Sequence, residues 1–289
     1  MANKKIQCES VWKIFGKLPK KVWEILHHSP GKEKAVLAQH GCSLGLQNIN
    51  LSIEPGEVFA IMGLSGSGKS TLLRCMNRLI DASSGKIWID DKDITTMQPR
   101  EIKELRQKKV SMVFQHFALL PHRHVLDNAA FGLEAQKVDQ ETRYKMAKEM
   151  LEMVGLKGVE NFYPEELSGG MQQRVGLARA LLTHSEILLM DEPFSALDPV
   201  IREQMCDEFL KIVSHLKKTI VFITHDMAEA LKVANRIAVM KDGKILQIGT
   251  PEEIVLHPCD AFVEKFVHSA FSILKIKSVS IKNWISEKS

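Results

Sequence analysis

The chain has 289 residues, of which 45% are hydrophobic and 26% charged, and its formal net charge is +4. These values are ordinary for a soluble globular protein of one large or two smaller domains, and so mild a charge does not indicate a nucleic-acid partner. No apolar run approaches the roughly 18 residues needed to span a bilayer, and no signal peptide begins the chain. The five cysteines lie far apart without a C-x-x-C pair, which favours a reducing cytosol over a disulfide framework or zinc site.

The first expected strand covers residues 6–15. Aromatic side chains supply a flat apolar face of the kind on which a nucleotide base stacks. Phe15 is therefore the candidate for binding a base, with Trp12 as the alternative. Residues 17–45 then predict two short helices that form an insert. A peripheral helical decoration is the simpler interpretation of this insert, and a partner-docking or regulatory surface is the other.

A glycine-rich loop with the spacing G-x-x-x-x-G-K-[ST] follows an apolar strand at residues 58–62 and precedes a helical pattern. Such a loop binds phosphate in this context, because its backbone N–H groups and the helix N-terminus point to one place. Lys69 is expected to reach the β- and γ-phosphates, and the Ser70 hydroxyl to bind Mg²⁺. The expected nucleotide-binding residues are Gly63, Leu64, Ser65, Gly66, Ser67, Gly68, Lys69, Ser70 and Thr71.

The middle of the chain changes from strands to helices. Strands are expected at residues 86–90 and 110–114, with a helix over 99–108 between them, and the second strand delivers Gln115. Residues 116–166 have a mainly helical, polar-rich pattern. We therefore expect a helical subdomain inserted between two halves of an α/β core.

Three histidines, His116, His122 and His124, cluster in the first loop of this subdomain. They invite a metal-binding interpretation, but no further ligand type at metal-binding spacing accompanies them. Solvated or hydrogen-bonded histidines are the favoured interpretation.

A second anion-binding site is predicted where a helix begins after residue 167. Ser168 suits the N-cap position, and Gly169 and Gly170 leave backbone N–H groups uncovered at the start of the helix. An ordinary capped helix does not need two successive glycines, so the pattern favours a bound anion.

Two buried strands in the second half of the chain end in polar residues. The apolar run 187–190 is followed by Asp191 and Glu192, and the run 219–223 ends close to His225. Ligands bind outside the carboxyl ends of strands in open α/β sheets, so these side chains are candidates for the same site.

The remaining elements carry no further chemical motif. A long helix is expected over residues 195–217, and strands at 236–240 and 244–248 are joined by an Asp-Gly turn. A final helix begins near Pro251, and the tail from residue 270 has only weak alternation.

In this order, a P-loop, a glutamine after a strand, a Leu-Ser-Gly-Gly helix start, an Asp-Glu pair and a strand-terminal histidine resemble the nucleotide-binding subunit of an ABC transporter. The resemblance covers residues 6–268, and Leu-Ser-Gly-Gly is its most discriminating motif. More narrowly, the chain is similar to the ATP-binding subunits of glycine betaine/proline (quaternary amine) uptake systems. The stretches that carry this similarity are Phe15-Gly16 with the insert, 61–71, 114–122, 125–128 and 194–199.

The resemblance implies an α/β fold with a P-loop NTPase core of ABC type. It consists of a mixed, largely parallel sheet with helices, an antiparallel β subdomain and an inserted helical subdomain. Residues 1–268 would form the ATP-binding domain, with the insert at 17–45 and the helical subdomain at 116–166. Residues 269–289 would be a short tail without the tandem CBS domains that many of these subunits carry.

The same resemblance implies a head-to-tail homodimer that buries two ATP molecules. Each site would combine the P-loop of one copy with Ser168, Gly169 and Gly170 of the other, and Asp198 would couple the two sites. The partners would be integral-membrane permease subunits and, indirectly, an extracytoplasmic substrate-binding protein, at the cytoplasmic face of the membrane and without nucleic acid. The transported substrate would be glycine betaine, proline, or another quaternary amine or amino acid.

The implied catalytic residues are Glu192, His225, Gln115 and Lys69. Glu192 would be the general base for the attacking water, and Asp191 would order Mg²⁺ through its hydration shell. Gln115 would contact Mg²⁺ or the water, and His225 would bind the γ-phosphate and orient Glu192.

Two positions depart from the family pattern. Met171 stands where many ABC proteins have glutamine, although this subgroup commonly has methionine. Asp90 and Asp91 form a turn where glycine is usual, which makes a positive φ less favourable. The alternative function is a soluble ABC ATPase that acts on ribosomes or DNA, and a P-loop kinase or GTPase would leave the Leu-Ser-Gly-Gly motif unexplained.

Overall fold

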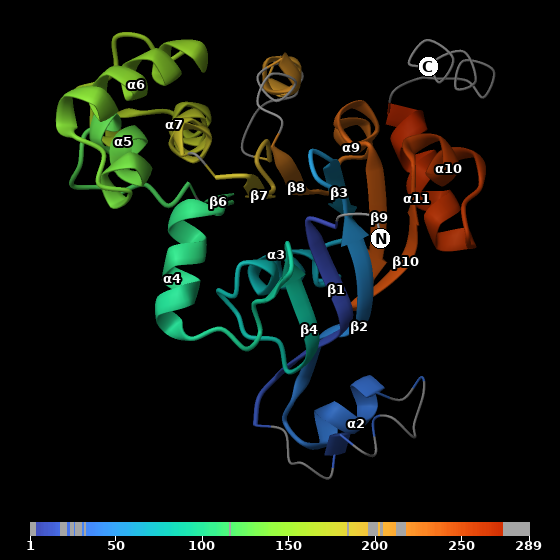
Figure 1. The fold of residues 1–289 in the computed structure, drawn as a ribbon. Coiled ribbons are helices and arrows are strands. Elements are labelled where there is room, and N and C mark those ends of the chain that lie inside the picture. The colour runs from blue at the N-terminus through green and yellow to red at the C-terminus, as the bar shows by residue number, and fades with distance from the viewer. Residues whose placement is uncertain are drawn as a thin grey trace.

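The computed structural model describes residues 4–17, 22–23, 26, 31, 33–115, 117–183, 185–195, 202, 205–211 and 218–273. Figure 1 shows two sheets at the centre, a lobe of helices on one side and a small helical insert below them.

A six-stranded sheet forms the centre of the molecule. Its strands, in spatial order, are β10 (Lys244–Gly249), β9 (Arg236–Lys241), β3 (Val58–Met62), β8 (Thr219–Thr224), β7 (Ile187–Asp191) and β6 (Val110–Val113). All neighbours pair in parallel except β10, which is antiparallel to β9. Every residue of β3, β7 and β8 is buried, as expected for strands with both faces covered.

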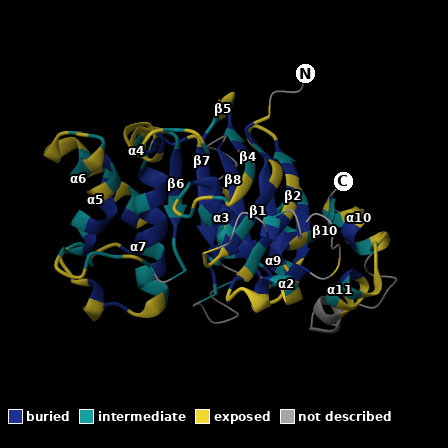
Figure 2. Ribbon diagram, turned by 90° about the horizontal axis from the view of Figure 1, so that it is seen from below, coloured by how far each residue is buried: buried dark blue, intermediate teal, exposed yellow. Residues whose placement is uncertain are grey.

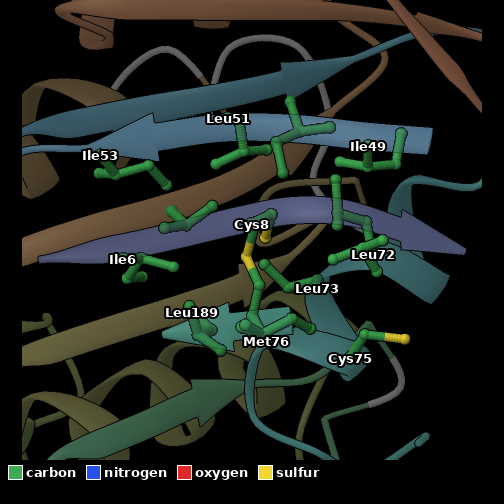
Figure 3. Packing of buried hydrophobic residues seen from close by; sticks show 14 of the residues in the cluster. Ile6, Cys8, Ile49, Leu51, Ile53, Leu72, Leu73, Cys75, Met76 and Leu189 are labelled. Atoms are coloured by element: carbon green, nitrogen blue, oxygen red, sulfur yellow. The ribbon is translucent and has the colours of Figure 1, made fainter. Parts of the chain in front are cut away.

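A four-stranded antiparallel sheet faces the central sheet across one helix. It consists of β2 (Ser43–Ile53), β1 (Ile6–Phe15), β4 (Ser84–Ile89) and β5 (Lys92–Asp93). Between the sheets lies α3 (Lys69–Met76), whose Leu72, Leu73 and Met76 are fully buried. Figure 3 shows these side chains packed against Ile6 of β1 and against β2. This core fixes α3, and with it the end of the P-loop.

The opposite face of the central sheet is covered by α9 (Met227–Val233) together with α10 (Pro251–Leu256) and α11 (Ala261–Ile273). Phe194, Phe209 and Phe222 are buried in this second core. The sequence analysis did not identify α9 and expected one C-terminal helix where there are two. A signal for α9 is present, since Asp226 caps it by accepting hydrogen bonds from Ala228 N and Glu229 N.

The helical lobe consists of α5 (Val125–Ala135), α6 (Gln140–Met153) and α7 (Gly169–Leu182), with a short 3₁₀ turn η1 (Pro164–Glu166) before α7. The three helices share a core of their own, and Figure 2 shows its buried face turned inward and an exposed outer face on α6. Helix α4 (Pro99–Lys108) connects β5 to β6, where the sequence predicts it. None of the described helices has the length and apolar character required to cross a membrane.

The insert after β1 is partly described. Its helix α2 (Glu33–Gln39) is present as predicted, and Leu37 is buried against Ile14 and Cys42 at the end of the β1–β2 pair. Of the first expected helix, Val22, Trp23 and Leu26 are described, and all three are helical. Most of its other residues lie outside the described part of the chain.

Asp90, in the turn between β4 and β5, adopts the positive φ of 51° that glycine would favour. Its carboxylate contacts Lys5 at 2.7 Å and Lys109 at 3.1 Å. Both lysines also contact Glu186, which precedes β7. The acidic residue thus joins a four-charge network between the two sheets, which offsets the backbone cost of its conformation.

Candidate nucleotide site

The P-loop runs from the end of β3 to the start of α3, and its glycines are required by close packing. A Cβ on Gly63 would lie 2.2 Å from Met240 O, and one on Gly68 would lie 2.5 Å from Gly45 O. Gly68 is also the N-cap of α3, with a φ of 100°. A side chain at either position would displace backbone, so the loop keeps its shape only with glycine.

Lys69 is buried at the first position of α3, with 5% of its surface exposed. Its ammonium group donates to Gly63 O at 2.8 Å and to Leu64 O at 3.0 Å. Burial lowers the pKa of Lys69, and the negative charges of Glu192 and Asp191 partly oppose this. The lysine therefore lies inside the loop, between the carbonyls of the P-loop and the acidic end of β7.

Asp191 is the last residue of β7, and its side chain is fully buried. It accepts a hydrogen bond from Ser70 Oγ at 2.8 Å and pairs with Arg74 at 3.3 Å. The sequence predicted Ser70 and Asp191 as neighbours of one cation. It missed Arg74, one helical turn after Ser70, whose charge balances the buried carboxylate.

Glu192 follows β7, and its side chain contacts residues that follow the two neighbouring strands. Its Oε2 accepts from Gln115 Nε2 at 3.3 Å and lies 3.4 Å from His225 Nδ1. Gln115 follows β6 and His225 follows β8, on either side of β7. Glu192 itself has a φ of 51°, a conformation that a non-glycine residue adopts only under constraint. This turn directs the carboxylate toward the two flanking side chains.

Of the two aromatic candidates for the base, the structure favours Phe15. Phe15 is 40% exposed as a residue, and a Cβ on Gly45 would lie 2.7 Å from Phe15 Cε2, so the ring rests on the start of β2. Trp12 is 8% exposed and makes an edge contact with Trp23 of the insert. Because Trp12 is buried, we keep Phe15 as the candidate for binding the base and interpret Trp12 as a packing residue.

The second predicted anion site is built as expected but stands apart from the P-loop. Ser168 caps α7 by accepting from Met171 N at 3.3 Å, and Ser168 and Gly169 are exposed. Within the described residues, no hydrogen bond or ion pair links this turn to the P-loop. Asp198, the predicted coupling residue, lies outside the described residues.

Features of the structure, in addition to the sequence motif, fit the P-loop to a nucleoside triphosphate. Ser67 Oγ is buried without a hydrogen-bond partner, although its backbone atoms are bonded to neighbouring segments. Buried hydroxyl groups nearly always have a hydrogen-bond partner. We therefore expect a bound ligand to form a hydrogen bond with Ser67 Oγ. Ser70 Oγ and the Asp191 carboxylate are oxygen donors of the type that Mg²⁺ prefers.

Two of the three histidines that cluster before α5, His122 and His124, belong to the described residues. His124 stacks near Tyr163, with ring centroids 4.2 Å apart. In the portion of the chain that was searched, no group of three or more potential metal ligands occurs. His116 is not among the described residues.

A strand, a glycine loop and a helix, with paired acids at the end of an adjacent parallel strand, define the class of P-loop NTPases. The ABC transporter family model matches residues 46–195. A trimethylamine N-oxide transport system ATP-binding protein of Pelagibacter ubique is 50% identical over 285 residues, covering 98% of this chain and 83% of the relative. The chain therefore belongs to the ABC transporter family.

Other relatives name related transport systems. A glycine betaine transport ATP-binding protein of Bacillus subtilis is 54% identical over 263 residues, and a glycine betaine/proline betaine transport system ATP-binding protein of Escherichia coli is 48% identical over 262. Each match covers 91% of this chain, but the chain spans 63% and 65% of those relatives' lengths. The resemblance drawn from the motifs is confirmed.

Solved ABC cassettes share the fold. A dimeric ATP-binding cassette in a post-hydrolysis state, bound to ADP and Pi, superposes with a TM-score of 0.73 at 32% identity. The match covers 85% of this chain and 98% of that one. The predicted fold class is thereby confirmed in its topology.

Proposed function

We propose that this chain is the ATP-hydrolysing subunit of an ABC importer, with residues 1–268 as its ATP-binding domain. The observation that carries the proposal is the meeting of Gln115, Glu192 and His225 at the carboxyl ends of adjacent strands, beside a P-loop whose lysine and serine face Asp191. An importer also accounts for the helical lobe, which a plain P-loop kinase would not need.

Glu192 is the general base of this proposed reaction. Its carboxylate takes a proton from the attacking water, while His225 and Gln115 hold it in place. Lys69 and the backbone N–H groups of the P-loop bind the phosphates, and Phe15 supports the base. Ser70 and Asp191 would hold Mg²⁺, which neutralises charge on the phosphate oxygens.

A head-to-tail homodimer completes the site. Ser168 and Gly169 lie exposed at the start of α7, where the helix N-terminus favours an anion, and no phosphate-binding loop of the same chain is bonded to them. Two solved cassettes that match this chain are described as dimeric. Both observations support a γ-phosphate held between the P-loop of one copy and the Ser168 turn of the other.

A groove between the core and the helical lobe is the proposed docking surface for membrane-embedded permease subunits. It is lined by Leu79, Phe114 and Phe131 among others, and Leu79 and Phe131 are 43% and 37% exposed. Exposed apolar side chains in a groove are typical of protein interfaces. The groove lies next to Gln115, so movement at the nucleotide can reach it. In this proposal the subunit would lie at the cytoplasmic face of the membrane, with an extracytoplasmic binding protein as an indirect partner.

The proposed cargo is glycine betaine, proline or a related quaternary amine or amino acid. Relatives at 48% to 54% identity are named for glycine betaine, proline betaine and trimethylamine N-oxide transport. These compounds share a nitrogen substituted with methyl groups and without N–H bonds. The cargo itself would contact the permease and the binding protein.

Two measurements test the proposal. Phosphate release from Mg²⁺-ATP by the purified chain should be abolished by Lys69→Ala, and equal rates in the two proteins would refute the ATPase assignment. Affinity purification of the tagged chain from solubilised native membranes should recover an integral-membrane permease. Recovery of ribosomes or DNA instead would favour the non-transport alternative.

A further inference from the structure

The insert helix α2 is fixed to the rest of the molecule next to the P-loop. Glu33 Oε1 accepts a hydrogen bond from Gln47 Nε2 of β2 at 2.6 Å, and the two residues are 7% and 8% exposed. On the surface beside them, Lys34 pairs with Asp242 in the β9–β10 turn. Figure 1 shows α2 at the end of the β1–β2 pair. One short helix thus contacts both a strand and a hairpin turn.

Strand β2 and the β9–β10 turn are hydrogen-bonded to each other, and the turn is hydrogen-bonded to the P-loop. Gln47 N donates to Gly243 O at 2.8 Å, and Gly243 N donates to Ser67 O at 3.0 Å. Ser67 precedes Gly68 and Lys69. A continuous hydrogen-bonded route therefore leads from Glu33, through Gln47 and Gly243, into the phosphate-binding loop.

Close backbone packing restricts movement of the segments that carry these hydrogen bonds. A Cβ on Gly243 would lie 3.0 Å from Gly45 O, and one on Gly68 would lie 3.5 Å from Gly243 Cα as well as near Gly45. The ring of Phe15 also rests on Gly45. Because packed interiors transmit displacements, a shift at the start of β2 would move the base platform and the P-loop together.

The carboxylate of Glu33 is held in its charged form. Burial acts to raise its pKa, but hydrogen bonds from the backbone N–H groups of Glu33 and Gly31 and from Gln47, with the charge of Lys244, lower it below its usual value. A charged acceptor makes a stronger hydrogen bond than a neutral one. The Glu33–Gln47 contact is therefore the firmer of the two attachments, because the Lys34–Asp242 pair is exposed.

We propose that the insert helix α2 is a positioning element for the nucleotide, with Glu33 as its positioning residue acting through Gln47 and the β9–β10 turn. The inference deepens the proposed function and rests on it. It assigns the insert an action on ATP affinity, where the sequence alone left decoration and a regulatory surface as alternatives. Glu33 touches neither the nucleotide nor the reacting atoms, so its effect falls on binding and not on turnover.

Replacing Glu33 with alanine tests this directly in the full chain. We expect Glu33→Ala to raise the KM for ATP and its Kd by about three- to tenfold, because one buried hydrogen bond that aligns the loop is lost. We expect kcat to stay within about twofold, since no group that touches the reacting atoms changes. Glu33→Gln keeps an acceptor oxygen for Gln47 but loses the charge, so it should restore KM in part. Steady-state kinetics and titration calorimetry with Mg²⁺-ATP measure both quantities.

Two further variants separate positioning from general loss of stability. Tyr144→Phe removes a hydrogen bond to Asp127 in the helical lobe, remote from the P-loop, and should leave KM unchanged even if the melting temperature falls. Lys34→Glu, at an exposed site that does not threaten folding, should raise KM by about twofold through repulsion of Asp242.

The possible outcomes separate a failure of the positioning role from a failure of the proposed ATPase function. If the native chain does not bind ATP, the proposed function fails. If it binds ATP but Glu33→Ala and Lys34→Glu leave KM unaltered, or if Glu33→Gln fails to restore KM even in part, the positioning role alone is refuted.

Discussion

Glu192 is the residue on which the proposed chemistry depends, because Gln115 and His225 both face the same carboxylate oxygen. Glu192→Gln keeps the size and shape of the side chain but removes the base. We expect ATP binding to remain and the rate of hydrolysis to fall by at least about 100-fold, since proton transfer is lost from the transition state. Single-turnover assays with Mg²⁺-ATP measure this fall. A variant that hydrolyses ATP at the native rate would exclude Glu192 as the base.

Ser67 offers a second test, because its buried hydroxyl has no hydrogen-bond partner among the described residues. A buried unsatisfied polar group costs about 1–3 kcal/mol, so Ser67→Ala should leave the melting temperature of the nucleotide-free chain unchanged or raised. The same variant should gain less stabilisation from saturating ATP than the native chain does. Thermal unfolding with and without ATP tests both effects, and Ser65→Ala, whose hydroxyl is exposed, controls for the nucleotide-free arm. A marked fall in the nucleotide-free melting temperature of Ser67→Ala would contradict this interpretation.

The residues of the candidate site could be predicted to the extent that they follow strands. Asp191, Glu192, Gln115 and His225 each end a short apolar run, and strand ends in a parallel sheet share an edge. Arg74 could not be predicted in this way, because its pairing with Asp191 depends on how α3 turns toward β7. The buried hydroxyl of Ser67 without a hydrogen-bond partner can likewise be recognised only in the three-dimensional structure.

Among the elements, the charge network that joins the β4–β5 turn to the start of β7 gives a pH-dependent prediction. Hydrogen bonds from Lys109 and Lys5 lower the pKa of Glu186 from 4.5 to about 2. The stabilisation is therefore fully present above pH 4.5 and is lost as the pH falls toward 2. Because Glu186 is half exposed, we expect a modest effect on the free energy of unfolding. Denaturant unfolding at a series of pH values should show a shallower acid decline for Glu186→Gln, and parallel curves would contradict the assignment.

The groove beside α5 gives another prediction at this scale. Phe131→Asp places a charge on its exposed apolar wall, so we expect recovery of the permease from membranes to fall while ATP hydrolysis by the isolated subunit stays within about twofold. Met153→Asp is the matched control, since Met153 is an exposed apolar residue of α6 outside the groove lining. Equal recovery of permease with Phe131→Asp and the native chain would remove the groove as docking surface.

Periodicity predicted the longer elements and missed short ones with mixed patterns. Helix α4 and the strands of the central sheet lie where expected, because their apolar spacing is regular. Helix α9, seven residues long, follows β8 after only a short polar turn, and its cap at Asp226 was the overlooked signal. The attachment of α2 could not be predicted from the sequence, because it depends on how α2 folds back onto β2 and on a contact with Asp242, which lies far along the chain.

At the scale of the whole molecule, the proposed composite site takes its two halves from separate places in the chain. The P-loop lies between the two sheets and the Ser168 turn lies on the helical lobe, without a bond between them in the described residues. A second copy placed head to tail, as we propose, would bring a P-loop and a helix start together. The transport function proposed for this chain therefore rests on association that depends on ATP.

The most direct test of this account is the oligomeric state of Glu192→Gln with Mg²⁺-ATP, measured by sedimentation velocity. We predict a monomer without nucleotide and a dimer with ATP, because binding persists while hydrolysis cannot reopen the pair. Adding Ser168→Arg to the same protein should return it to a monomer, since a large side chain then fills the exposed turn. A Glu192→Gln protein that binds ATP but stays monomeric, or a dimer that survives Ser168→Arg, would contradict the composite site.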